Sequence, residues 1–287
     1  NRNKPLCDVP QMITGNRPAD GGHLIIENED YEEFLLKEPS ARPYVKRLVG
    51  STEFINNKKR WCLWLVGISP SELRKMPMVL QRVEACKEDR EKSPDAGRRK
   101  LAETPTLFRE INNPVSFILV PKVSSEKRRY VPMGFLDNNT ISTDLNFIIP
   151  EATMYHFAIL TSNIHMAWMR AVCGRMKSDY RYSANIVYNN FPWPTPTEEQ
   201  KQKIEQTAQA ILDARALYPD SSLADLYDEL TMPPELRKAH HQNDIAVMQA
   251  YGFTKGSEAY KSETACVAEL MKRYEHLCTQ QQNTKEQ

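Results

Sequence analysis

The stretch VSFILVPKVSSEKRRYVPMGF, residues 115–135, decides the fold. Its first six residues are almost all apolar or β-branched and lie between prolines, which is typical of a buried strand. A β-type pattern resumes over residues 130–135. Between the two lies a wholly polar segment, SSEKRR at residues 124–129, which we call the charged finger. The sequence therefore predicts a buried sheet that presents a short charged segment at the protein surface.

The composition of the 287-residue chain is that of a globular protein, with 40% hydrophobic and 26% charged residues. No apolar run reaches the roughly 18–20 residues of a membrane span, and the start of the chain lacks the apolar core of a signal peptide. The six cysteines include no C-x-x-C pair. Free thiols in a reducing compartment are therefore expected, rather than a zinc site or disulfides. Because the chain does not start with Met, we expect an excised fragment or a processed product.

The net charge of +1 hides an uneven distribution along the chain. Residues 1–194 carry 28 Lys+Arg against 22 Asp+Glu, whereas residues 195–287 carry 10 against 15. Within residues 39–194 the excess is larger, at 24 basic against 14 acidic side chains. A basic middle and an acidic end indicate that the middle meets a polyanion. Solvated helix faces of different sign would give the same counts.

The order of the elements predicts an α+β protein in two parts. Residues 1–194 are expected to form a mixed α/β domain, and residues 195–287 an all-helical domain that begins at the cap residue Thr197. Residues 155–176 are predicted to form one long helix with His165 in the core, and residues 186–188 another strand. The proline-rich segment FPWPTP, residues 191–196, marks the expected boundary.

The charged finger has side chains that can read DNA bases. If the finger is extended, Glu126 and Arg128 point to the same side. Arginine can bind guanine O6 and N7, and a carboxylate can accept from cytosine N4, so such a pair could read one C·G base pair. A surface ion pair of little consequence is the alternative. Other basic residues near predicted strands would contact phosphates, namely Lys58, Lys59, Arg60, Lys122, Lys127 and Arg129.

Motifs of catalysis are weak or missing in this sequence. Residues 190–193, NFPW, resemble the N-P-P-[YF] motif of amino methyltransferases but depart from it at the second position. The ten glycines include no G-x-G loop of the kind that binds S-adenosylmethionine. Glu199 and Lys201 have the spacing of a nuclease metal site but lack the strand context. We therefore expect no catalytic centre, no metal and no cofactor in this chain.

Three long segments give a specific resemblance: SSEKRRYVPMGF (124–135), LTSNIHMAWMRAVCGRMKSDYRYSANIVYNNFPWP (160–194) and LADLYDELTMPPELRKAH (223–240). They resemble the C-terminal portion of MmeI-type DNA methyltransferases, the fused restriction-and-modification enzymes of bacterial defence. The first two are similar to the target recognition domain of this family, and the third to its C-terminal helical domain. PWPTPTEEQKQKI (192–204) is in addition similar to the end of recognition domains in Type I specificity subunits.

The resemblance implies a cytoplasmic, bacterial adenine-N6 DNA methyltransferase, often with a nuclease, whose catalytic parts and S-adenosylmethionine site would lie upstream of Asn1. Double-stranded DNA and the upstream methyltransferase domain would be its partners, with no membrane. Glu126 and Arg128 match base-reading positions of the family. The signature Arg181, Tyr182 and Ser183 would either contact the DNA backbone or pack the long helix on the sheet. A protein-interaction or scaffolding domain is the alternative function, and an enzyme in its own right would need a cofactor site.

Overall fold

The computed structural model describes residues 2–285, with side chains to residue 283, and divides them into two compact units. The first unit contains the N-terminal residues up to Ile13, Ser116–Phe135 and the chain from Phe147 onward. The second unit contains Thr14–Val115 and Leu136–Asn146. The α+β class is confirmed. The helices after residue 195 belong to the same compact unit as the charged finger, and the boundary at residues 194/195 stays a prediction.

The second unit is built on a four-stranded sheet in the order β2 (Ile25–Glu27), β4 (Arg60–Leu63), β3 (Val45–Val49) and β8 (Thr140–Ser142). The first three strands are antiparallel, and β3 pairs in parallel with β8. Apolar side chains of this sheet pack with helices α1 (Asn28–Lys37) and α4 (Pro77–Glu91) in one core. Short elements complete this unit: η1 (Pro39–Tyr44), α2 (Ser51–Ile55), α3 (Pro70–Arg74), α5 (Ala96–Lys100) and η2 (Leu101–Glu103).

A buried arginine on α4 ties the second unit together. Arg90 is fully buried, and its guanidinium nitrogens donate to five backbone carbonyls at 2.7–3.0 Å. Burial lowers its pKa. Since guanidinium has five N–H donors in a fixed planar arrangement, one side chain can hold two separate segments of irregular backbone. The accepting residues are Pro18, Ala19, Leu101, Thr104 and Leu107.

The main sheet of the first unit has the order β1 (Ile13–Thr14), β9 (Asn146–Pro150), β5 (Ser116–Pro121) and β7 (Gly134–Asp137). The predicted strand at residues 115–120 is confirmed as β5, which is buried from Phe117 onward. The second predicted run is a strand only at its end. Residues 130–133 leave the sheet, because their apolar side chains pack in the helical core instead.

A second, three-stranded sheet consists of β10 (Gly174–Met176), β11 (Asp179–Arg181) and β6 (Val123–Ser124). The predicted single helix over residues 155–176 is wrong. It is two helices, α6 (Met154–Leu160) and α7 (Asn163–Val172), and Ser162 caps the second by accepting from His165 N. The expected strand at residues 186–188 is also wrong, because it is a π-helical turn, η3 (Ala184–Tyr188).

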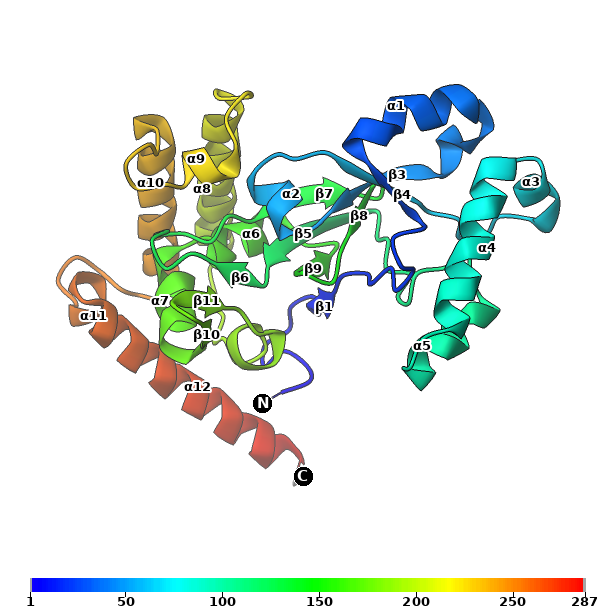
Figure 1. Cartoon of the computed structure of the whole chain (residues 1–287). Coiled ribbons are helices and arrows are strands. Elements are labelled where there is room, and N and C mark those ends of the chain that lie inside the picture. Colours follow the sequence, from blue (N-terminus) through cyan, green and yellow to red (C-terminus); the bar gives the residue numbers. More distant parts are fainter. Residues whose placement is uncertain (1, 286–287) are drawn as a thin grey trace. The chain divides into compact units, whose positions relative to one another are not determined.

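The helices of the C-terminal part pack with those that follow the main sheet (Figure 1). Thr197 caps α8 (Glu198–Ala216) as predicted, and α8 packs against α10 (Pro234–Ala250) and α6. The helix α12 (Glu263–Lys285) packs along α7, and α9 (Leu223–Leu226) and α11 (Glu258–Lys261) are short. Within the described residues, no helix has the length and apolar character needed to cross a membrane.

Candidate nucleic-acid interface

The charged finger is a tight turn rather than an extended strand. Arg128 N donates to the carbonyl of Ser125 at 3.1 Å, which closes a turn over residues 125–128. Lys127 N also donates to Ser125 Oγ at 3.3 Å. Glu126 and Lys127 occupy the exposed centre of the turn. The strand alternation considered for Glu126 and Arg128 therefore does not apply, and their positions depend on the turn and its supports.

A β-hairpin supports the finger on its N-terminal side. Strand β6 pairs with β11 in a register that places Ser124 opposite Tyr180. Tyr182 N donates to the Lys122 carbonyl at 2.8 Å, which continues the pairing. At the turn itself, Asp179 Oδ1 accepts from Glu126 N at 3.4 Å. The hairpin thus fixes the backbone that enters the finger.

Buried helical side chains hold the segment that leaves the finger. The hydroxyl of Tyr130 donates to Asp244 Oδ2 at 2.6 Å, and Asp244 Oδ1 accepts from Asn163 N at 2.8 Å. Arg215 Nη1 donates to the carbonyl of Met133 at 2.6 Å. Burial raises the pKa of Asp244 to about 6, although both hydrogen bonds oppose this shift. Helices α8 and α10 thus anchor residues 130–133 through specific polar contacts.

An aromatic contact adds to this anchor. The ring of Tyr130 stacks on His240 of α10, with centroids 4.1 Å apart. His240 Nε2 lies 2.7 Å from the hydroxyl of Tyr227, to which Arg215 Nε donates at 2.8 Å. Burial holds the pKa of His240 well below its usual value, so the ring is neutral at pH 7. Both the hydroxyl and the ring of Tyr130, in the segment after the finger, are therefore held by side chains of α10.

Both candidate base-reading side chains line one cleft of about 380 Å³ next to α7 and α12. Glu126 Oε2 lies 3.6 Å from Arg175 Nη1 of the neighbouring hairpin, and both side chains remain 46% exposed. Burial lowers the pKa of Arg128, and the charges of Asp179 and Asp228 oppose this shift. Exposed ion pairs are worth only about 0–1 kcal/mol. A nucleobase could therefore replace Arg175 as the partner of Glu126 at low cost.

The remaining candidates in the first unit differ in accessibility. Arg129 and Arg181 are exposed, and Lys122 Nζ lies 4.6 Å from the ring centroid of Phe147. Tyr182 is only 3% exposed, and its hydroxyl lies 2.9 Å from Nε2 of the buried His165. For Tyr182 the geometry favours the packing alternative over a DNA contact. Likewise, the hydroxyl of the half-buried Ser183 accepts from Ile186 N at 3.3 Å, which caps η3.

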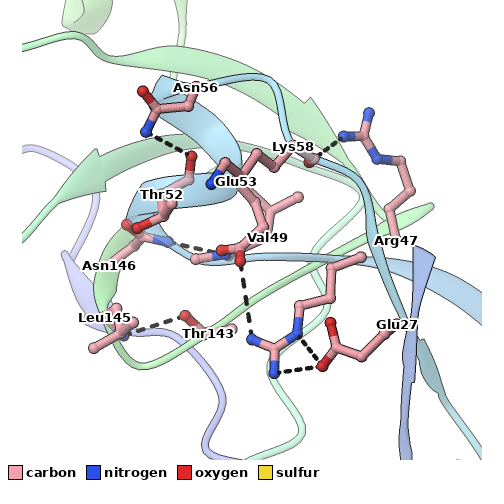
Figure 2. A network of polar contacts seen from close by, with 12 residues as sticks. Glu27, Arg47, Val49, Thr52, Glu53, Asn56, Lys58, Thr143, Leu145 and Asn146 are labelled. Atoms are coloured by element: carbon pink, nitrogen blue, oxygen red, sulfur yellow. Dashed lines mark hydrogen bonds and ion pairs between the residues drawn. The ribbon is translucent and has the colours of Figure 1, made fainter. Parts of the chain in front are cut away.

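In the second unit, the three basic candidates follow α2. Lys58 and Lys59 are exposed, and the Lys58 carbonyl accepts from Arg47 Nη2 at 3.3 Å (Figure 2). Arg60 donates to Glu27 Oε1 at 3.1 Å and lies 3.9 Å from Glu53 Oε1. Because two carboxylates already oppose the charge of Arg60, the two lysines are better placed to meet phosphates.

Several residues beside the finger were not predicted from the sequence. Arg175 and Asp179 belong to the β10–β11 hairpin, whose first strand falls at the end of the helix predicted over residues 155–176. The signal that could have revealed it is the polar segment GRMKSDYR after a buried helix. In the structure Lys177 lies at the turn of this hairpin with a φ of +56°. Asp228 comes from the distant loop after α9, and no local pattern connects it with the finger.

The side chains that resemble a methyltransferase motif have structural roles. Asn190 Nδ2 donates to the carbonyls of Asn185 and Ile186, and Phe191 is fully buried. Gly50 joins strand β3 to α2, but its amide already donates to Glu53 Oε2 at 2.9 Å. The residues present therefore do not fit S-adenosylmethionine. Among the described residues no group of three or more His, Cys, Asp or Glu side chains could hold a metal ion.

Comparisons with known proteins give consistent results. The MmeI target recognition domain family matches residues 1–195, and the MmeI C-terminal domain family matches residues 196–281. A protein named DNA methyltransferase A from Bacillus subtilis (strain 168) is 40% identical over 277 residues, which cover 96% of this chain and 31% of that protein. A solved structure of the Type IIL restriction-modification enzyme MmeI in complex with DNA matches with a TM-score of 0.92 and 46% identity.

That alignment covers 97% of this chain and 37% of the solved one, so the chain spans about a third of the length of both relatives. The two family matches meet between residues 195 and 196. The chain therefore belongs to the MmeI family, with its target recognition domain followed by its C-terminal domain.

Proposed function

We propose that this chain is a sequence-specific recognition module for double-stranded DNA. Glu126 and Arg128 contact base edges in the major groove, and basic side chains around them contact phosphates. The observation that carries this proposal is the arrangement of the finger. Two side chains capable of base recognition stand on one rigidly supported turn and line the same cleft.

The role of the supports follows from the energetics of base recognition. A bidentate arginine–guanine contact discriminates by about 1–3 kcal/mol only if the donors are held in the right plane. The hairpin holds Glu126 N through Asp179, and α10 holds Tyr130 through Asp244. A flexible finger would pay the entropy of ordering when it binds, which lowers affinity and specificity together.

The module serves a catalytic domain elsewhere in the same polypeptide. We propose that the parent protein is an adenine-N6 DNA methyltransferase of a bacterial restriction-modification system, working in the cytoplasm where its DNA substrate lies. Its S-adenosylmethionine would be bound by the catalytic domain. The residues of this chain would position the duplex so that the target adenine reaches that domain.

Fluorescence anisotropy with a labelled duplex, at 50 and 200 mM salt, tests the proposal. Neutralisation of several phosphates predicts a steep loss of affinity between the two concentrations, by a factor of about ten for every two contacts. A chain that binds no duplex at 50 mM salt would instead favour a protein-interaction domain, and the proposal would be wrong.

A further inference from the structure

A groove on the helical part lies directly beside the finger. Its volume is about 680 Å³, and it is lined by Arg129 and Tyr130 on one side. The other side comes from the segment between α9 and α10 and from the first half of α10. The lining residues there are Tyr227, Glu229, Met232, Pro234, Arg237, Lys238 and His241.

The charge of this groove is opposite to that of the part of the chain around it. Residues 195–287 contain 10 basic and 15 acidic side chains. The groove nevertheless collects Arg237, Lys238 and His241 from one face of α10, where residues three and four apart are neighbours. Arg129 adds a further positive charge, and Glu229 is the acidic residue that lines it. The groove is therefore a local basic surface on an acidic helical part.

Two of these basic groups are available to a ligand. Lys238 and His241 are exposed, and within the described part of the chain neither pairs with a carboxylate. Arg237 is engaged, because its Nη2 donates to the carbonyl of Glu229 at 3.0 Å and so shapes the segment before α10. The apolar lining consists of Met232 and Pro234, and the largely buried Tyr130 also borders the groove.

We propose that this groove binds the sugar-phosphate backbone of the duplex whose bases the finger reads. Arg129 joins the two surfaces, because it lines both the finger cleft and the groove. The basic rim matches phosphates, and the apolar lining matches the deoxyribose between them. The inference rests on the proposed DNA-binding function, and it assigns a phosphate-binding role to the helical C-terminal domain.

The contact also has a mechanical consequence. The groove and the finger root share Tyr130, whose hydroxyl is fixed by Asp244 on the same helix, α10, that carries Lys238. A phosphate bound at Lys238 and a base bound at Arg128 are thus held by connected parts of one rigid assembly. The groove would set the register of the duplex against the finger.

The test uses the complete gene product, a cognate duplex and the variant Lys238→Glu. We expect the affinity of Lys238→Glu at 100 mM salt to fall about tenfold or more, equally for the cognate duplex and for duplexes with altered base pairs. The slope of log affinity against log salt concentration should become shallower by about one. Lys203→Glu is the matched control, because Lys203 is another exposed lysine of the helical part, on α8. It should stay within twofold of the wild type.

Methylphosphonate scanning of the duplex locates the contact. In the wild type, neutralising single phosphates should weaken binding at a few positions, and at one or two of these the effect should disappear in Lys238→Ala. If the wild type binds DNA but Lys238→Glu binds equally well at every salt concentration, the groove proposal is wrong and the proposed function stands. If the wild type itself binds no DNA, the proposed function fails first.

Discussion

Replacing Tyr130 by Phe removes one hydrogen bond at the root of the finger and keeps the packed ring. Its hydroxyl donates to Asp244 Oδ2 at 2.6 Å, and both side chains are at least 96% buried. A hydrogen bond to a charged group contributes about 1.5–3 kcal/mol, against about 0.5–1.5 kcal/mol for a neutral pair. We expect Tyr130→Phe to lower the free energy of unfolding by about 2–3 kcal/mol at pH 8, where the carboxylate is ionised.

The loss of stability caused by Tyr130→Phe should become smaller as the pH falls. Asp244 has its pKa raised to about 6 by burial, so the folded state takes up a proton more readily than the unfolded chain does. Its ionised form opposes folding, and this cost decreases as the pH falls below about 6 and disappears only below the unfolded-state pKa of 3.8. The Tyr130 hydrogen bond lowers that pKa, so the variant gains more from protonation than the wild type. At pH 5 the difference should be about 1 kcal/mol.

Urea unfolding of both proteins at pH 5 and pH 8 measures these differences. Tyr218→Phe is the matched control, because Tyr218 donates to Glu235 at 2.8 Å on the surface, where the hydrogen bond adds little stability. Equal losses for Tyr130→Phe at the two pH values, or a loss below about 0.5 kcal/mol at pH 8, would refute the assignment of a buried ionised partner.

Three further predictions concern the two cores. Arg90→Met should destabilise the protein by about 5 kcal/mol or more in thermal or urea unfolding, because five carbonyls lose a charged donor. The control Arg74→Met, at an exposed arginine, should change stability by less than about 0.5 kcal/mol. A loss under about 1 kcal/mol for Arg90→Met would contradict this role. Burial lowers the pKa of His165 to about 3, so its contribution to stability is present above pH 6.5 and falls by about 2 kcal/mol at pH 5. The drop in unfolding free energy from pH 7 to pH 5 should therefore be smaller by that amount in His165→Gln than in the wild type. An equal drop in both proteins would contradict the lowered pKa of His165. Burial raises the pKa of the Cys62 thiol and brings that of Cys86 to about 11, so neither should react with a disulfide reagent at pH 8 until the protein is unfolded, which mass mapping of the labelled cysteines would check.

The elements that follow from local pattern were predicted well from the sequence. The strand β5 is a continuous apolar run between prolines, and α8 begins at a threonine cap with a glutamine three residues later. These signals depend on near neighbours in the chain. They also gave the α+β class and the position of the charged finger between two runs.

The errors have physical causes in particular residues. The apolar stripe of α6 continues into α7, so helical periodicity could not reveal the break at Ser162. The last three residues of η3, Ile186, Val187 and Tyr188, are β-branched or aromatic, which favours a strand, but tertiary packing holds them in a π-helical turn. The chain crosses four times between the two compact units, and no change in amino-acid composition marks these crossings.

The finger site was only half accessible to sequence reasoning. Its charged residues stand together in one short segment, so the sequence alone shows the segment, and their role in reading bases stays a prediction. Their conformation depends on Asp179 and Asp244, which lie about 50 and 115 residues further along the chain. A turn supported by residues so distant cannot be distinguished from an extended segment by local sequence alone.

The central claim is that the finger reads bases through Arg128. It is tested most directly by measuring the affinity of wild type, Arg128→Ala and Lys127→Ala for a cognate duplex and for every single-base-pair variant of it. The account predicts that Arg128→Ala loses about 1–3 kcal/mol of discrimination at one base pair, while Lys127→Ala weakens all duplexes equally. If both variants lose affinity uniformly over all duplexes, Arg128 does not read a base and the account is contradicted.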